Sequence, residues 1–109
     1  MATHHAKPGE IVNLDSWTDD LKKNMTKVVM KSEDMEIARL VIPAGKSIPD
    51  HKVPGPIIVH CIQGKINFTA MGNTQELSKG QLLHLEPSEI HSLEGVDDAV
   101  ILLTILFKN

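Results

Sequence analysis

Residues 45–64 indicate the fold class, and they read Gly45-Lys-Ser-Ile-Pro-Asp-His51-Lys-Val53-Pro-Gly-Pro-Ile57-Ile-Val-His-Cys-Ile-Gln-Gly64. The run Ile57–Ile62 is rich in Ile and Val and lies between two turn signals. Glycine accepts a positive φ without steric cost, so Gly64 marks a tight turn into the next run, Lys65–Ala70. The stretch therefore predicts two strands joined by a tight turn.

The same alternation continues on both sides of this stretch. Turn signals built on Gly and Pro recur roughly every 8–12 residues, which is typical of a β-sandwich or barrel. Residues 31–34 have the composition of a hairpin turn. The predicted strands are Thr26–Met30, Met35–Ile42, Ile57–Ile62, Lys65–Ala70, Gln75–Leu77, Gln81–Leu85, His91–Leu93 and Ala99–Phe107.

The one candidate helical segment is short and lies at residues 15–23. Asp15 or Ser16 is suited to cap a turn or two, and Trp17 and Leu21 stand four residues apart on one face. The sequence has no partner helix for a doubly wound fold, so we expect an all-β chain. We divide it into an N-terminal arm with a short helical segment over 1–25 and a barrel over 26–109, a single domain overall.

Composition excludes several classes of partner. The net charge is −3 with scattered lysines, and aromatic residues make up only 3%, so a nucleic-acid-binding role is not expected. The longest apolar run, Ala99–Phe107, reads as a fully buried strand and is too short for a membrane-spanning helix. Residues 1–10 lack the apolar run of a signal peptide. The single Cys61 has no internal disulfide partner, which favours a reducing, cytoplasmic location.

Two glycine-led stretches, Gly45–Gly64 and Gly80–His91, resemble the two sequence motifs of cupins. The spacings from Gly45 to His51 and from Ile57 to Gly64 fit the family pattern, while Gly80 to Pro87 is one residue longer. The similarity covers about residues 35–107 and points to a small single-domain cupin, RmlC-like and of the cupin type-2 family. It implies a double-stranded β-helix, or jelly-roll, barrel.

The resemblance also implies a metal centre, which in typical cupins is held by three His and one carboxylate. Such a set suits Fe, Mn, Ni, Cu or Zn. Here only His51 and His91 stand at ligand positions, because Val53 and Ile57 occupy the other two. The metal-binding motif is therefore degenerate, and two imidazoles alone predict weak affinity. His60 and His84 are further candidate ligands, although strand parity turns His60 away from the side that Ile57 faces.

Two functions follow from this half-complete motif. We favour a small-ligand-binding or sensory barrel that holds a small carboxylate or an apolar acid, with two histidines at the pocket mouth. The alternative is a metal-dependent dioxygenase or isomerase with a reduced ligand set, and no catalytic residue is assigned. The resemblance further suggests a homodimer through the outer sheet. The expected pocket residues are His51, Val53, Ile57, Val59, Cys61, Phe68 and His91.

Overall fold

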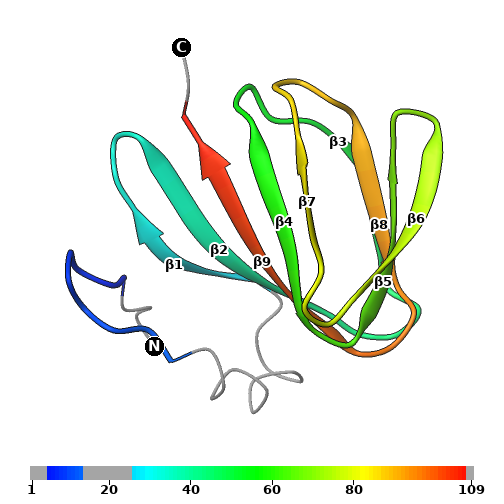
Figure 1. The fold of residues 1–109 in the computed structure, drawn as a ribbon, viewed down its shortest axis with the longest axis horizontal. Coiled ribbons are helices and arrows are strands. Elements are labelled where there is room, and N and C mark those ends of the chain that lie inside the picture. The colour runs from blue at the N-terminus through cyan, green and yellow to red at the C-terminus, as the bar shows by residue number, and fades with distance from the viewer. Residues whose placement is uncertain (1–4, 14–25, 108–109) are drawn as a thin grey trace.

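The computed structural model describes residues 5–13 and 26–107, which form a two-layered β structure (Figure 1). One sheet has five strands in the order β1-β2-β9-β4-β7, and the other has four in the order β3-β8-β5-β6. All strand pairs are antiparallel. The strands are β1 (Thr26–Lys31), β2 (Met35–Ile42), β3 (Ser47–His51), β4 (Ile57–Gln63), β5 (Lys65–Ala70), β6 (Asn73–Ser78), β7 (Leu82–Leu85), β8 (His91–Gly95) and β9 (Ala99–Leu106).

The all-β prediction is confirmed, because residues 5–13 and 26–107 contain no helix. Within the same ranges, no helix is long and apolar enough to cross a membrane. The helical segment predicted at residues 15–23 lies outside the described residues.

The core lies between the two sheets and follows from strand parity. In β4, Ile57, Val59 and Cys61 are buried while the residues between them are more exposed. In β5, Ile66 and Phe68 alternate with partly exposed neighbours in the same way. Because successive side chains point to opposite faces, each strand gives one row to the shared interior. The barrel is thus filled by aliphatic side chains around one phenylalanine.

Strand β9 differs from its prediction. It is buried from Ala99 to Ile101, but the side chains from Leu102 onward are only partly covered and Leu106 is exposed. The expectation of a fully buried strand is therefore wrong for its second half. In this half, Leu103 and Ile105 still pack against the core but are only partly buried, and the strand ends where the Leu106 N–H donates to the Pro56 carbonyl at 3.0 Å.

Strand β3 was missed by the sequence prediction. Its residues, Ser47-Ile-Pro-Asp-His51, have little β-propensity, and Pro49 cannot donate a ladder hydrogen bond. The segment nevertheless pairs with β8, with a register irregularity between Ile48 and His51. An edge strand tolerates proline because one of its sides has no ladder partner.

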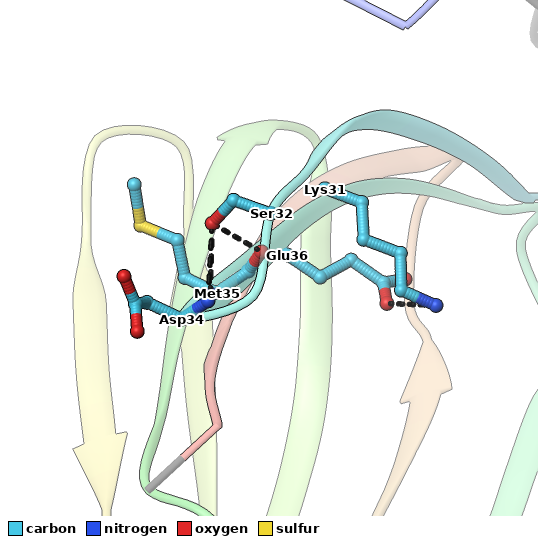
Figure 2. Close-up of polar contacts among 5 residues, drawn as sticks. All are labelled: Lys31, Ser32, Asp34, Met35 and Glu36. Carbon is cyan, nitrogen blue, oxygen red and sulfur yellow. Dashed lines mark hydrogen bonds and ion pairs between the residues drawn. The ribbon is translucent and has the colours of Figure 1, made fainter.

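The hairpin turn predicted at residues 31–34 is confirmed. The Ser32 Oγ accepts hydrogen bonds from the Asp34 N–H at 3.2 Å and the Met35 N–H at 3.3 Å (Figure 2). Lys31 and Glu36 face each other across the two strands, with Nζ and Oε1 4.0 Å apart. The Ser32 side chain therefore stabilises the turn through local hydrogen bonds that do not depend on long-range packing.

The tight turn at Gly64 is also confirmed, since its φ is +76°. A Cβ at this position would lie 2.1 Å from the Asp98 carbonyl oxygen and 2.8 Å from the Ala99 Cα. Glycine is therefore required twice, once for the backbone angle and once for the close approach of the segment entering β9. Gly72 has a similar φ of +75° but would place a Cβ in open space.

This contrast makes a matched pair of substitutions. We expect Gly72→Ala to lower the free energy of unfolding by about 1 kcal/mol, the usual cost of a left-handed non-glycine residue. Gly64→Ala should cost at least ~2 kcal/mol more, because backbone must also move to relieve the overlap. Urea denaturation of both variants measures the difference. Equal losses would mean that the approach to Asp98 and Ala99 does not constrain this turn.

Candidate functional site

Two histidines meet at one end of the barrel interior. His51 is the last residue of β3, His91 is the first of β8, and the two are paired in register. Their ring centroids are 4.1 Å apart with an interplanar angle of 61°. His91 also stacks on Phe68 of β5, with centroids 5.7 Å apart and an angle of 15°. The fold thus brings together the two histidines that the sequence motifs singled out.

The tautomer of both rings is set by backbone carbonyls. The Nδ1 of His51 lies 3.0 Å from the Pro49 oxygen, and the Nδ1 of His91 lies 3.0 Å from the Glu89 oxygen. A carbonyl oxygen only accepts hydrogen bonds, so each Nδ1 must carry its proton and donate it. In the neutral ring, Nε2 then holds a free lone pair. The site therefore offers two imidazole Nε2 atoms as acceptors or metal ligands.

The two rings differ in their surroundings. His51 is exposed, whereas His91 is buried with only 4% of its surface exposed. Burial lowers the pKa of His91 below its ordinary value; the hydrogen bond to Glu89 opposes this shift, and the charge of His51 adds to it. His91 is consequently held in its neutral form near pH 7.

The space behind the rings is small. An interior cavity of about 20 Å³ is lined by the two histidines and seven apolar side chains. This volume accommodates about one water molecule. Of the predicted pocket residues, His51, Val59, Phe68 and His91 line it, while Val53, Ile57 and Cys61 do not. The apolar lining residues are Leu40, Ile48, Val59, Phe68, Leu93, Ile101 and Leu103.

The three pocket residues that do not reach the cavity have distinct positions. Ile57 and Cys61 point inward as parity predicts, but they lie in the packed core. Val53 follows the end of β3 and packs partly buried against the core. Cys61 Sγ donates weakly to the Gln63 carbonyl at 3.3 Å. Alternation along the strand predicts the face to which these side chains point. It does not predict how far along the barrel they lie, because that position depends on tertiary packing.

The donor set does not fit the four-ligand metal centre of typical cupins. Among residues 5–13 and 26–107, no group of three or more His, Cys, Asp or Glu side chains is placed to hold a metal ion. His60 pairs with Leu82 and has the opposite parity to the inward Val59. His84 is exposed and pairs with Ile58. Neither histidine joins the His51–His91 pair.

A backbone contact that the sequence does not signal holds the loops at this end. The Ser88 N–H donates to the Val53 carbonyl at 2.8 Å, which ties the β7–β8 loop to the β3–β4 loop. Ser88 adopts a positive φ of 66°, a conformation that non-glycine residues rarely take. The Pro87-Ser88 pair in the sequence signalled a turn but not this link between the loops.

The buried His91 predicts a specific pH dependence of stability. The pKa of His91 is lower in the folded protein than in the unfolded chain, where it is about 6.5. The contribution of neutral His91 to the free energy of unfolding is therefore complete above about pH 6.5. It is lost as the pH falls from there toward the folded pKa. We expect the melting temperature to drop between pH 7 and pH 5, and His91→Gln to reduce this drop. Differential scanning calorimetry across that range tests it, with His84→Gln as an exposed control. An unchanged pH profile in His91→Gln would contradict the assignment.

The comparisons with known proteins agree with this architecture. The family profile described as "Cupin domain" matches residues 38–106, which is more than half of the chain. No curated protein sequence matches the chain.

Several solved structures share the fold. A cupin superfamily protein from Desulfitobacterium hafniense superposes with a TM-score of 0.82 at 16% identity, covering 99% of this chain and 100% of the other. An RmlC-like cupin from Desulfovibrio desulfuricans gives 0.70 at 24% identity, covering 97% and 96%. KdgF from Halomonas sp. gives 0.72 at 16% identity, covering 77% and 78%. These likenesses concern the fold, and together with the profile match they show that the chain belongs to the cupin family.

Proposed function

We propose that this cupin is a small-ligand-binding domain in which His51 and His91 recognise the polar group of the ligand. The observation that carries the proposal is that both Nδ1 atoms are bound to backbone carbonyls, which leaves both Nε2 atoms available. The surrounding wall is apolar. An apolar site with a few convergent polar groups is the usual form of a small-molecule site.

The small cavity restricts what the ligand places between the histidines. Only a group about the size of a water molecule fits behind the rings, so the remainder of the ligand must lie outside them. His51 is exposed and gives access from solvent. A carboxylate meets these conditions when only one of its oxygens enters the cavity, and its oxygens accept hydrogen bonds from protonated Nε2 atoms.

Proton uptake separates this proposal from the metal-dependent alternative. A carboxylate requires at least one protonated ring, so its affinity rises as pH falls. A transition metal requires neutral imidazoles, so its affinity falls over the same range. The alternative, a dioxygenase or isomerase with a reduced ligand set, uses the same two Nε2 atoms without a third protein ligand from the described ranges.

Thermal shift with propionate and with Zn²⁺, each at pH 5.5 and 7.5, tests the two functions. We expect propionate to raise the melting temperature more at the lower pH, and His51→Gln and His91→Gln each to remove that increase. His84→Gln is the matched control and should respond as the unmodified protein does. Stabilisation by Zn²⁺ alone, greater at pH 7.5, would favour the metal alternative, and no stabilisation by either would overturn both.

We infer further that a second copy of the chain covers part of the outer face of the five-stranded sheet. Ile58 and Leu82 are exposed there, at 37% and 59%. Leu82 of β7 and Leu102 of β9 flank His60 of β4 in the ladder, so a largely apolar strip with one histidine crosses the three strands. Exposed apolar side chains grouped in this way often mark a protein–protein contact.

Leu82→Asp tests the dimer, because a charge in the strip opposes its burial. We expect the unmodified protein to have the mass of a dimer in light scattering at micromolar concentration, and Leu82→Asp to have that of a monomer. Ile90→Asp is the control, since Ile90 is similarly exposed, at 55%, on the β7–β8 loop. A monomeric mass for the unmodified protein would refute the inference.

A cytoplasmic location remains a prediction. Its support is the single Cys61, which is free and fully buried. Burial raises the pKa of its thiol, which keeps the side chain in its neutral, less reactive form.

A further inference from the structure

A second hollow lies at one side of the barrel, between β7 and the β5–β6 hairpin. Its volume is about 270 Å³. Phe68, Leu83 and Leu85 give it apolar walls, and Asn73, Gln75 and His84 give it polar groups. We call it the lateral cleft. It is much larger than the cavity behind His51 and His91, and Phe68 lines both.

The two amides of the cleft stand where the fold calls for apolar side chains. Asn73 pairs with Ala70, and Gln75 pairs with Phe68. Directly opposed residues in an antiparallel pair point to the same face, and both Ala70 and Phe68 are buried inward. Asn73 and Gln75 therefore face the interior side of their sheet, where side chains are normally apolar. The next inward residue of β6, Leu77, follows the rule and is buried.

The arrangement of the strands explains why the side-chain amides of Asn73 and Gln75 are exposed although they face inward. β6 and β7 are each the last strand of their sheet, and the turn between them is pinned to β4 by the Gly80 N–H, which donates to the Cys61 carbonyl at 2.8 Å. From this turn the two strands diverge toward the mouth (Figure 1). Leu77 fills the closed end, and the amides remain exposed at the open end. The sheets thus leave a wedge that the chain's own side chains do not fill.

The chemistry of the walls selects the charge of a ligand. No Lys, Arg, Asp or Glu lines the cleft, and His84 is its one titratable side chain, so a cation finds no anionic partner there and an anion finds no permanently charged one. Each amide offers an acceptor oxygen and a donor nitrogen. Within the described part of the chain, neither amide makes a hydrogen bond of its own. The side-chain amides of Asn73 and Gln75 thus provide two donor–acceptor pairs beside Leu83 and Leu85. Such pairs complement a neutral planar group that also combines a hydrogen-bond donor with an acceptor.

We propose that the lateral cleft binds a small neutral molecule whose flat apolar body carries an amide, lactam or nucleobase edge. Asn73 and Gln75 pair with that edge, while Phe68, Leu83 and Leu85 contact the apolar body. Side-chain amides recognise such edges by paired hydrogen bonds, as Asn and Gln do with adenine. The site is separate from the His51–His91 pair and does not depend on the function proposed for it.

Benzamide is a suitable probe, because it combines a flat ring with one neutral amide. In a titration followed by amide and methyl NMR spectra, we expect saturable shifts at the side-chain NH₂ groups of Asn73 and Gln75 and at the methyls of Leu83 and Leu85. Benzoate and benzylamine keep the ring but carry opposite charges, and each should bind at least about tenfold more weakly, because an unpaired charge must be desolvated.

Variants on one strand supply the matched controls. Asn73→Ala combined with Gln75→Ala should weaken benzamide binding about tenfold or more, in line with the loss of two hydrogen bonds. Thr74→Ala and Glu76→Ala change the outward residues of the same strand and should leave the affinity unchanged. All four positions are exposed, so we expect these variants to fold.

Any of three results in the titrations would overturn the proposal, and a fourth concerns where the shifts appear. The three are the absence of saturable shifts, an affinity unchanged in the double variant, and binding of benzoate as tight as that of benzamide. Shifts confined to His51 and His91 would also overturn it while supporting a ligand at the histidine pair. The propionate experiment reads only the histidine pair, so failure of one proposal is distinguishable from failure of the other.

Discussion

Strand β9 is the element on which the five-stranded sheet depends, because it pairs with β2 on one side and β4 on the other. Its pairing with β2 is unbroken from Met35–Leu106 to Ile42–Ala99. Its pairing with β4 brings Ile57, Val59 and Cys61 into the same interior layer. The close approach of Gly64 to Asp98 and Ala99 sets where β9 begins relative to the β4–β5 turn. Since β1 and β7 join the sheet through β2 and β4, the whole layer is assembled around this strand.

The histidine pair depends on the opposite sheet and on backbone geometry. β3 is a weak edge strand, yet its pairing with β8 places His51 against His91. The backbone carbonyls of Pro49 and Glu89 then fix both rings in one tautomer. A site whose donors are oriented before a ligand arrives loses less entropy on binding. With Val53 and Ile57 in place of two ligands, this preorganisation supports the proposed recognition of a ligand rather than a four-ligand metal centre.

The side of the barrel formed by β6 and β7 departs from the rule that a two-layered sheet buries apolar residues on its inner faces. Asn73 and Gln75 occupy inner positions, and the strands spread apart where these amides lie. Local rules of patterning tend to fail at functional sites, where another requirement overrides packing. The lateral cleft departs from the apolar pattern of the inner faces with two amides, and the histidine pair departs from it with two imidazoles. Phe68 lines both places.

The sequence alone determined the features that depend on neighbouring residues. Turn composition predicted the hairpin after Lys31 and the positive φ of Gly64, and period-two alternation predicted that Ile57, Val59 and Cys61 share one face while His60 has the other. Only the tertiary structure decided the pairing of Ser47–His51 with β8, the cavity of about 20 Å³ and the inward direction of Asn73 and Gln75. The physical reason is the sequence separation over which each feature is determined. Turn angles and side-chain parity are set within a few residues, whereas cavity size, strand partners and the spreading of sheet edges arise from packing between distant segments.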